Sequence, residues 1–474
     1  MNQLIWLRSD LRVTDNTALS AAMNAGPTIA LYLITPVQWL AHGDAACKVD
    51  FWLRNLGALS ARLAELNVPL LIRCVDDWQA VPALVADLCR EHEIGSVHIN
   101  DEYGVNEQRR DEAVAAALLH TGASLRQHLD QLLFAPGSVQ SLAGQGFKVF
   151  SPFRKVCYSR LSHSLPRCLP VPAPQAWLPV SRDPLPMTIE GFAPPTEQLR
   201  SFWPAGEDFA RTRLACFVED DMADYQQRRD LPAEPGTSQL SPYLAAGVIS
   251  PRQCLHAALA TNRGELDSGN PGAVTWINEL LWREFYKHVL VGYPRVSMGR
   301  AFRPETEALP WRNAPDELAA WQQGRTGFPI IDAAMRQLLA TGWMHNRLRM
   351  LVAMFLSKNL LIDWREGERW FMRHLIDGDL AANNGGWQWS GSTGTDSVPY
   401  FRLFNPLSQS AKFDPQGRFL RQWLPELAHL NDRDIHDPSF RQGLHLNGYP
   451  HPITELATSR ERALSAFRHL AKRL

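Results

Sequence analysis

Four segments in the second half of the chain combine polar and aromatic residues in a way that could do chemistry. They are GTSQLSPYLAAGVISPRQC (236–254), VTWINELLWREFYKHVL (274–290), TGWMHNRLRMLVAMFLSKNLLIDW (341–364) and LIDGDLAANNGGWQWSGSTGTDSVPYFRLFNP (375–406). In the first segment the hydroxyls of Thr237, Ser238 and Ser241, with nearby backbone N–H groups, could cradle an anion. Taken alone, however, this segment fits a helix N-cap and a turn better.

The second segment predicts a helix with charged and aromatic stripes. Trp276, Glu279 and Arg283 recur on one face, and Trp282 and Tyr286 form a neighbouring aromatic stripe. By itself the pattern describes a core stripe beside a solvated ion pair of small energy. It becomes informative only together with the other segments.

The third segment places Asn346, Arg347 and Arg349 inside an otherwise apolar helix. Polar groups in such a setting must be paired or must face a ligand. The alternative is a cluster of cations at a helix end that serves solubility. We favour the ligand-facing interpretation.

The fourth segment is dense in Asp, Asn and Gly within a helical region. Asp377 and Asp379 are followed by Asn383 and by Trp387 and Trp389. Carboxylates and amides suit a polar heterocycle, and indole rings suit stacking on a flat one. A long ordered loop is the alternative. The four segments together predict a large polar and aromatic pocket, but they do not identify a reaction.

Several common motifs are absent from the sequence. There is no HExxH, GxSxG, GxGxxG or GxxxxGK[ST], and the seven cysteines include no CxxC pair. We expect neither a metal site nor a disulfide framework. We expect a reduced protein in the cytoplasm. No apolar run reaches the roughly 18–20 residues of a membrane span. The early charges of MNQLIWLRSD argue against a signal peptide.

Composition indicates a folded protein with an uneven charge distribution. The 474 residues are 45% hydrophobic and 20% charged, and the formal net charge is −1. Residues 1–130 carry 10 Lys and Arg against 16 Asp and Glu, whereas the remainder carries 38 against 33. A polyanion would therefore meet the second part, although ordinary surface variation explains this imbalance about equally well. Ten of the 16 tryptophans lie between residues 276 and 423.

The N-terminal part alternates short apolar runs with amphipathic stretches. The runs cover 4–7, 28–35, 69–75, 96–100 and 124–129, and the amphipathic stretches lie near 16–25, 46–66, 79–92 and 106–121. This alternation predicts βαβ units, and hence an α/β domain with a doubly wound parallel sheet. Any ligand should lie outside the carboxyl ends of the strands.

The rest of the chain predicts a linker and a helical domain. The proline-rich stretch 165–186 cannot form a helix or a central strand. Helical patterns follow at 207–229, 251–261, 271–291, 316–323, 329–341, 344–358, 366–376 and 457–472. We therefore divide the chain into an α/β domain (1–130), an extended linker (131–200) and an all-helical domain (201–474).

Six stretches together resemble one family. They are LIWLRSDLRVTDNTAL, GTSQLSPYLAAG, WINELLWREFYKH, FPIIDAAMRQLLATGWMHNRLRM, LIDWREGERWFM and DGDLAANNGGWQWSGSTGTDSVPYFRLFNP. They resemble the deoxyribodipyrimidine photolyases of the photolyase/cryptochrome superfamily, and more narrowly the bacterial class I enzymes that repair cyclobutane pyrimidine dimers. The resemblance covers essentially the whole chain and is most specific over 276–406.

The resemblance implies a light-driven flavoenzyme whose helical domain binds FAD. The excited, fully reduced flavin would pass an electron to the dimer, whose cyclobutane ring then opens. Residues implied to bind FAD are Tyr225, Thr237, Ser238, Gln239, Leu240, Ser241, Trp276, Glu279, Arg283, Asn346, Arg349, Asp377, Gly378, Asp379 and Asn383. Asn383 would lie near the flavin N5, and Arg349 would pair with Asp377. Gln239 stands where many relatives have Arg.

The same resemblance implies DNA containing pyrimidine dimers, double- or single-stranded, as the partner. The dimer would be flipped out of the duplex into the pocket. Glu279 would hydrogen-bond to it, Trp282 and Trp389 would stack on it, and Met350 would touch it. The full set implied to meet DNA is Arg229, Glu279, Trp282, Tyr286, Asn346, Arg347, Met350, Trp389 and Arg402.

Trp311, Trp364 and Trp387 match the family's tryptophan chain, which relays an electron to photo-oxidised flavin. With Glu279 and Asn383 they form the implied catalytic set. The resemblance further implies a monomer in the bacterial cytoplasm, at the nucleoid when bound to DNA.

The α/β domain would hold a light-harvesting antenna. His42, Asn106 and Glu107 match residues that bind 5,10-methenyltetrahydrofolate in the family. Ser297 and Met298, however, stand where a close relative has a Cys–Lys pair, which removes one cation from the path of a polyglutamate tail. Folate is the first expectation, and a deazaflavin or an empty site are the alternatives.

Three other functions are compared with dimer repair. A cryptochrome-type light receptor would more often have Asp or Cys at Asn383, and it typically carries a signalling tail after the last helix. A (6-4) photoproduct enzyme typically presents a histidine pair, whereas this chain has Met344-His345-Asn346. A plain nucleotide-binding module would leave 375–406 unexplained.

Overall fold

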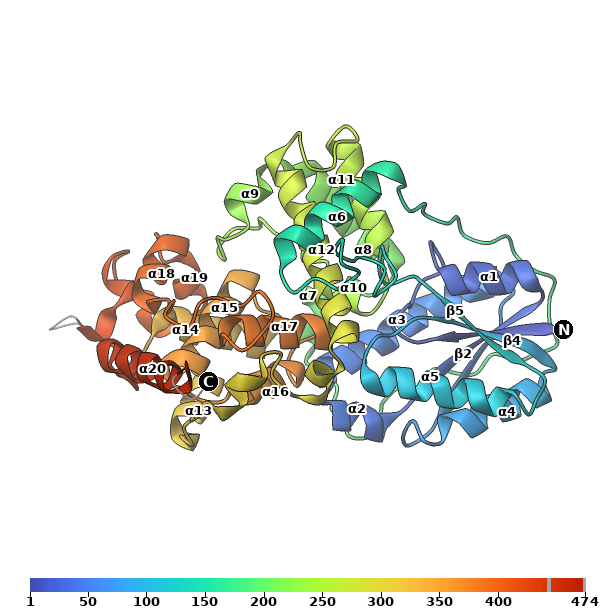
Figure 1. The fold of residues 1–474 in the computed structure, drawn as a ribbon, viewed down its shortest axis with the longest axis horizontal. Helices are drawn as coiled ribbons and strands as arrows, with labels where there is room; N and C mark the ends of the chain where they lie inside the picture. The colour runs from blue at the N-terminus through green and yellow to red at the C-terminus, as the bar shows by residue number, and fades with distance from the viewer. Residues whose placement is uncertain (441–444, 472–474) are drawn as a thin grey trace. The chain divides into compact units, whose positions relative to one another are not determined.

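The computed structural model describes residues 1–440 and 445–471. The chain packs as two compact units, and Figure 1 shows their helices and strands. Unit 1 contains Met1–Ala223, Ser238–Pro294 and Ile376–Gly378. Unit 2 contains Asp224–Thr237, Arg295–Leu375 and Asp379–Leu474.

A five-stranded sheet forms the N-terminal part of unit 1, with strand order β3-β2-β1-β4-β5 and every neighbouring pair parallel. In register, Leu4 of β1 lies opposite Ile29 of β2 and Val97 of β4. Each apolar run became a strand: β1 (Asn2–Leu7), β2 (Thr28–Ile34), β3 (Leu70–Cys74), β4 (Ile94–Asn100) and β5 (Ser124–His128). The predicted doubly wound sheet is confirmed.

Helices cover the sheet on both faces. Figure 1 shows α1 on one face and α4 and α5 on the other. The bounds are α1 (Thr17–Ala25), α2 (Pro36–His42), α3 (Ala46–Glu65), α4 (Val81–Glu91) and α5 (Val105–Leu118). Only α2 was not predicted, because its proline looks like a helix breaker. Pro36 stands in the first turn, where a missing N–H costs nothing.

The expectation of an extended segment over 131–200 is wrong in its middle. Helix α6 (Phe150–His163) lies there, and α7 (Glu197–Phe202) begins before its end. Phe150, Phe153, Cys157 and Leu161 of α6 are buried, so tertiary packing explains a helix that the polar pattern hides. The proline-rich stretch between α6 and α7 contains no helix or strand, as predicted. The three domain boundaries themselves stay a prediction.

Part of this proline-rich stretch is bonded to the β2–β3 side of the sheet. The side chain of Gln175 exchanges two hydrogen bonds with the backbone of Thr28, at 2.7 and 2.8 Å. The N–H of Asp183 donates to the carbonyl of Leu70 at 2.9 Å, and its carboxylate accepts from the N–H of Ile72 at 2.7 Å. The segment is therefore ordered against the sheet rather than free in solvent.

Four more helices complete unit 1: α8 (Glu207–Cys216), α10 (Ser241–Ala245), α11 (Pro251–Thr261) and α12 (Pro271–Gly292). The predicted helix over 207–229 is helical over 207–228 but changes its type along the way. Helix α8 gives way to a π-helical turn at Phe217–Asp221. Three consecutive acidic residues, Glu219, Asp220 and Asp221, lie in that turn, and negative charge at the carboxyl end of a helix opposes its dipole.

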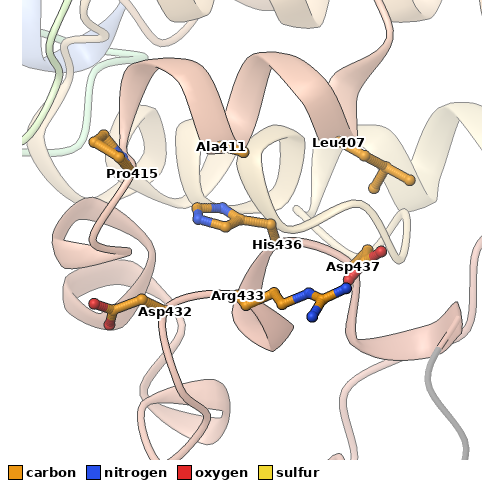
Figure 2. A pocket seen from close by; sticks show the side chains of 7 residues that line it. All are labelled: Leu407, Ala411, Pro415, Asp432, Arg433, His436 and Asp437. Atoms are coloured by element: carbon orange, nitrogen blue, oxygen red, sulfur yellow. The ribbon is translucent and has the colours of Figure 1, made fainter.

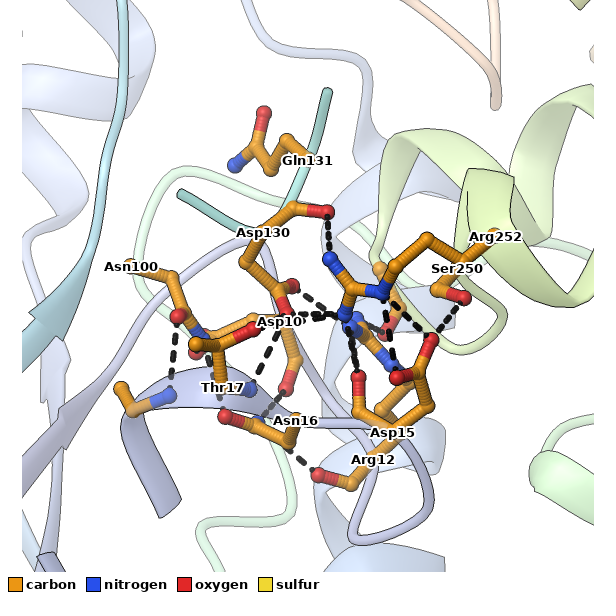
Figure 3. A network of polar contacts seen from close by, with 12 residues as sticks. Asp10, Arg12, Asp15, Asn16, Thr17, Asn100, Asp130, Gln131, Ser250 and Arg252 are labelled. Carbon is orange, nitrogen blue, oxygen red and sulfur yellow. Dashed lines mark hydrogen bonds and ion pairs between the residues drawn. The ribbon is translucent and has the colours of Figure 1, made fainter. Parts of the chain in front are cut away.

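A buried ionic network joins the first loop of the sheet to α11 (Figure 3). Arg252 contacts Asp15 at 2.9 Å and Asp130 at 2.8 Å, and Arg12 contacts Asp130 at 2.5 Å. Ser250 adds a hydrogen bond to Asp15. Burial opposes ionisation of Asp130, but the two guanidinium groups lower its pKa to about 2. The network is fully paired, which a buried set of charges requires.

The regular elements in the described part of unit 2 are all helices, and no β-strand occurs there. Its helices are α9 (Tyr225–Arg228), α13 (Pro315–Gln322), α14 (Pro329–Thr341), α15 (Asn346–Met354), α16 (Trp364–Met372), α17 (Leu380–Ser390), α18 (Pro406–Phe413), α19 (Arg418–Trp423) and α20 (Leu456–Ala471). The predicted helix 344–358 changes at its end into a π-helical turn, Phe355–Asn359. None of the described helices is long and apolar enough to cross a membrane.

Candidate active site

Helix α12 presents the side chains predicted to meet the substrate. Pro271 starts the helix, and the side chain of Asn270 caps it by accepting two backbone N–H groups. The helix then runs unbroken for 22 residues. One face is consequently shared by four predicted residues, spaced by three and four positions: Glu279, Trp282, Arg283 and Tyr286.

Trp282 is stacked from behind by a residue that sequence reasoning missed. Its ring lies 3.8 Å from that of Phe150, with an angle of 12° between the planes. Tyr286 lies beside it at 5.6 Å, and Phe285 meets it edge-on at 5.7 Å. Trp282 itself stays partly exposed. Phe150 covers one face of the indole and thereby orients the flat ring.

The opposite face of α12 is bonded to the chain that follows the sheet. Both carboxylate oxygens of the buried Glu284 accept backbone N–H groups, from Leu133 at 3.0 Å and from Phe134 at 2.8 Å. The ring of His288 lies 3.2 Å from the carbonyl of Phe134. These bonds fix how α12 is rotated, and so which face carries Glu279 and Trp282. Sequence reasoning missed Glu284, which looks like an ordinary charged residue.

The residues predicted to cradle phosphate have a suitable backbone. Gln239 has φ of 49°, in the left-handed region, and Leu240 is right-handed. Such a pair turns successive N–H groups toward one point, which suits an anion. The guanidinium of Arg213 donates to the side chain of Gln239 at 2.7 Å. Arg213 therefore brings a cation next to the predicted phosphate cradle.

The residues predicted to bind FAD divide between the two units. Unit 1 holds Ser238, Gln239, Leu240, Ser241, Trp276, Glu279, Arg283, Asp377 and Gly378, and unit 2 holds Tyr225, Thr237, Asn346, Arg349, Asp379 and Asn383. Arg283 donates within unit 1 to the carbonyl of Gln131 at 2.6 Å. The predicted pairing of Arg349 with Asp377 stays a prediction, as does the gathering of these residues in one site.

Asn383 is oriented by α16. Its amide donates to the carbonyl of Glu368 at 3.0 Å, while the neighbouring Asn384 donates to the Glu368 carboxyl at 2.8 Å. Asn384 in turn accepts from Gln388 at 2.8 Å. Burial raises the pKa of Glu368 to about 7. Glu368 was missed, because a Glu among the charged residues of α16 looks solvated.

The three tryptophans of the predicted relay lie in unit 2. Trp364 and Trp387 are buried in its main apolar cluster, and Trp311 is partly buried against it. Gly367, one turn after Trp364 on α16, gives Trp387 its space. A Cβ at Gly367 would lie 2.0 Å from the Trp387 ring. Trp387 therefore packs directly against α16, the helix that carries Trp364.

The cations predicted to meet DNA already have partners within unit 2. Arg347 contacts Asp230 at 2.5 Å and lies 4.7 Å from the ring centre of Phe413. The guanidinium of Arg229 lies over the ring of Tyr225 at 5.3 Å, and that of Arg402 lies over the ring of Phe404 at 5.7 Å. Met350 and Trp389 are partly exposed. The arginine side chains are thus partly preorganised.

His345 starts the helix that bears Arg347. Its Nδ1 accepts the backbone N–H of Arg347 at 3.2 Å, which caps α15. Burial lowers the pKa of His345 to about 4, so the ring is neutral and can accept at neutral pH. The side chain thus helps to fix the first turn of α15, where Asn346 and Arg347 lie.

The predicted antenna residues come together in unit 1. Nε2 of His42 faces the side-chain amides of Gln38 at 2.8 Å and Asn106 at 3.1 Å. It acts as an acceptor if both amides donate, which leaves the proton on Nδ1. Burial and the carboxylate of Glu102 raise the pKa of Glu107. His42 and Asn106 lie beyond the carboxyl ends of β2 and β4, where a ligand of a doubly wound sheet is expected.

A pocket of about 490 Å³ lies beside α18 and contains none of these residues (Figure 2). Its lining is Leu407, Ala411, Pro415, Asp432, Arg433, His436 and Asp437. Nδ1 of His436 bonds to the hydroxyl of Ser410 at 2.7 Å. Charges of both signs line an open surface there, and no further observation points to a ligand. Among the described residues, no group of His, Cys, Asp and Glu is arranged to hold a metal.

Two family models match the chain. Residues 3–175 match the DNA photolyase model, and residues 276–469 match the FAD binding domain of DNA photolyase. A deoxyribodipyrimidine photo-lyase of Escherichia coli (strain K12) is 45% identical over 469 residues, which cover 98% of each chain. This chain belongs to the DNA photolyase family.

Other members of the family confirm the architecture. A deoxyribodipyrimidine photo-lyase of Vibrio cholerae is 42% identical over 98% of this chain and 99% of its own. The crystal structure of a bacterial class III photolyase from Agrobacterium tumefaciens superposes with a TM-score of 0.88 at 34% identity, over 99% of this chain and 98% of the other. A cryptochrome from Synechocystis gives 0.87 at 27% identity, over 98% and 99%.

The photolyase models divide the predicted sites between them. The match to the FAD binding domain includes α12 from Trp276 onward, α15, α16 and α17, and with them Asn383 and the three tryptophans of the predicted relay. The N-terminal photolyase model includes His42, Asn106 and Glu107. Residues 225–241, which contain the predicted phosphate cradle, lie between the two matches. The predicted α/β domain with a helical FAD-binding domain is thus confirmed as a photolyase fold.

Proposed function

We propose that this protein is a deoxyribodipyrimidine photo-lyase, a carbon–carbon lyase that uses light to split cyclobutane pyrimidine dimers in DNA. The observation that carries the proposal is the 45% identity, along 98% of the chain, to a curated deoxyribodipyrimidine photo-lyase. The polar face of α12 supports it, because a carboxyl group and an indole ring are presented side by side there.

FAD would be held by the residues predicted for it. The backbone at Gln239 and Leu240 suits a phosphate, and Arg213 supplies a nearby cation. The fixed amide of Asn383 suits the polar edge of a flavin ring, since it can donate or accept. When bound, FAD would supply the light-excited electron that opens the cyclobutane ring.

The DNA lesion would be bound by groups with separate tasks. Glu279 would hydrogen-bond to the dimer, and Trp282 and Trp389 would stack on its two bases once they are flipped out of the helix. Met350 would fill the space beside it. The phosphates on either side would be met by Arg229, Arg347 and Arg402, with Tyr286 and Asn346 next to them. Both double- and single-stranded DNA are expected as substrates.

Trp311, Trp364 and Trp387 would relay an electron between solvent and the buried cofactor site. Indole can be oxidised by one electron, far more easily than the ring of Phe. The position of Trp387 against the Gly367 backbone keeps it close to the helix of Trp364. The relay serves photoactivation and is distinct from dimer splitting.

The antenna would bind beside His42, Asn106 and Glu107. The ring nitrogen of His42, an exposed amide and a carboxyl group with a raised pKa suit the amino-pteridine ring of a folate. We expect 5,10-methenyltetrahydrofolate there. We place antenna binding in residues 1–130 and FAD and DNA binding in 201–474, joined by a segment that contains α6. We expect a monomer that acts on DNA at the nucleoid.

The test is light-dependent repair by the purified protein. Reduced protein is illuminated with oligonucleotides that contain thymine dimers, and restoration of thymine is measured, with a dark sample as control. An absorption spectrum of the same protein should show flavin bands and a strong near-ultraviolet antenna band. Dimers that remain intact in light, in protein that retains FAD, would instead favour a cryptochrome-type receptor.

A further inference from the structure

A lysine that the proposed chemistry does not use is buried in the core of unit 2. Lys358 lies on the π-helical turn Phe355–Asn359 after α15, and it is 0% exposed. Its neighbours Phe355 and Leu356 belong to the main apolar cluster. An ammonium group in such surroundings needs good acceptors, because its burial is costly.

The acceptors are the carbonyl groups of one tight turn. Nζ of Lys358 lies 2.9 Å from the carbonyl oxygen of Arg402 and 3.5 Å from that of Pro399. The N–H of Arg402 donates to the same Pro399 oxygen at 2.9 Å and closes the turn Pro399–Arg402. The ammonium group thus bonds to both ends of the turn from the core side.

This turn belongs to the loop between α17 and α18, which carries Arg402 and follows Trp389, two residues predicted to meet DNA. Trp389 stands at the end of α17, and its carbonyl accepts the N–H of Val398 at 3.3 Å. Ser392 donates to the carbonyl of Val398 at 2.7 Å. On the outer side of the turn, Phe401 is 58% exposed and Arg402 is exposed. The turn therefore faces solvent on one side and Lys358 on the other.

The placement of Lys358 disfavours its charged form. Burial, and to a smaller extent the charge of Arg402, lower the pKa of Lys358 to about 7. A methionine of similar size would avoid this cost in an apolar cluster. A lysine that is buried at a cost, and whose bonds go to a single turn, is best explained by the turn that it holds.

We propose that Lys358 is a positioning residue for damaged DNA: its ammonium group fixes the Pro399–Arg402 turn and thereby directs Arg402 toward a DNA phosphate. The proposal rests on the proposed DNA-repair function. Lys358 itself touches neither DNA nor cofactor. It acts through the backbone of the turn, so its removal should change the loop first and DNA binding second.

The test compares Lys358→Met with Lys358→Gln, which keeps two N–H donors on a shorter chain. The first readout is amide hydrogen exchange of the turn in the free holoprotein. Exchange at Arg402 should rise roughly tenfold in Lys358→Met, because the turn opens more often. It should rise less in Lys358→Gln. Lys155→Met, which removes an exposed charge on α6, should leave that exchange unchanged.

The second readout is the dissociation constant for dimer-containing DNA. Lys358→Met should weaken binding roughly tenfold, the scale of one lost charged hydrogen bond. Arg402→Ala should weaken it similarly without changing the exchange of the turn. The double variant should bind no worse than either single variant, since both remove the same phosphate contact. Unchanged exchange in both Lys358 variants, or additive losses in the double variant, would overturn the proposal.

The proposed repair function and the proposed role of Lys358 can fail separately. If the unchanged protein does not prefer dimer-containing DNA over undamaged DNA, the proposed function fails, whatever the lysine does. If it has that preference and Lys358→Met keeps it at full affinity, only the role of Lys358 fails. Should Lys358→Met not fold, the Lys358→Gln variant decides both readouts.

Discussion

Trp311 can be exchanged for Phe without removing a hydrogen bond within the described structure. Its buried indole N–H has no partner there, and its ring packs against two apolar clusters of unit 2. Trp311→Phe should therefore keep the fold and FAD content, at a cost below about 1.5 kcal/mol. Photoreduction of oxidised FAD with an external thiol should be lost, because Phe is much harder to oxidise. Chemically reduced enzyme should still repair dimers.

Trp423→Phe is the matched control for this prediction. Trp423 also packs against the main cluster with a buried indole N–H that has no partner among the described residues, and it lies outside the predicted relay. FAD in the Trp423→Phe variant should be photoreduced at the normal rate. Normal photoreduction in Trp311→Phe would remove Trp311 from the relay, and loss of repair by the pre-reduced variant would make it a substrate or structural residue.

Lys358 should also change how stability depends on pH. Its pKa falls from 10.5 in the unfolded chain to about 7 in the folded protein. Between these values the unfolded chain binds more protons, so the free energy of unfolding rises with pH. The Lys358→Met variant lacks this titration, so its free energy of unfolding at pH 6 should exceed that of the unchanged protein by about 1–4 kcal/mol. Urea unfolding at pH 6, 8 and 9.5 should show the gap closing. A constant gap would contradict the shift.

The sequence identified residues whose type conflicts with their surroundings, and it missed those that look ordinary. Asn383 stands out because a buried polar group in a helix must have a reason, whereas the prediction for Asn346 is wrong: it lies exposed in the first turn of α15 rather than inside an apolar helix. Glu284 and Lys358 look like any charged residue on a helix. Their roles come from partners that are 151 and 44 residues away along the chain. Such pairings cannot be predicted from spacing alone.

Substitutions that remove the carboxylate of Glu284 should release helix α12 from its fixed orientation. Glu284→Ala leaves the buried N–H groups of Leu133 and Phe134 without their acceptor, which costs about 2–5 kcal/mol. Glu284→Gln keeps one acceptor oxygen and should lose less. Chemical denaturation measures this difference. The affinity for dimer-containing DNA should fall more in Glu284→Ala than in Glu284→Gln. The helix that Glu284 orients carries Glu279 and Trp282 on its opposite face. Equal stability of Ala and Gln variants would argue against this clamp.

Elements were predictable where one local signal dominated. The central strands β1, β2 and β4 are buried along most of their length and appear as apolar runs, whereas the outermost strand β5 is largely polar and only partly buried. Helix α17 was not predicted, because the Asn-Asn-Gly-Gly stretch in its middle has low helix propensity. It forms because Asp379 caps its first turn and because Asn384 and Gln388 bond to each other and to buried partners. Tertiary contacts overrode propensity there.

At the scale of the whole molecule, binding of damaged DNA should weaken with added salt. Each phosphate contact releases counterions, so Arg402→Ala should reduce the slope of log K against log[salt] by about one unit. Arg347 is already paired with Asp230 at 2.5 Å. Asp230→Asn should therefore strengthen binding at low salt by freeing that cation. Binding titrations between 50 and 200 mM salt measure both effects. An affinity independent of salt would contradict phosphate contacts.

The whole molecule also contains links that no local pattern announces. Arg12 and Arg252 meet at Asp130, which lies 118 and 122 residues away from them (Figure 3). The sequence predicted the sheet and the helices of unit 1 separately. It gave no indication that buried ions join the first loop to α11, because like and opposite charges are common on every surface.

The bonds of Gln175 and Asp183 to the β2–β3 side of the sheet have a consequence for how copies of the protein meet. β3 is an outermost strand, and a bare outermost strand invites a strand of another molecule to pair with it. The proline-rich segment occupies part of this position and cannot itself continue a ladder, since proline lacks an N–H. Asp183→Ala should leave repair intact but produce self-association that grows with concentration, which light scattering measures. A segment that looks like a spacer would thus keep a DNA-repair enzyme dispersed.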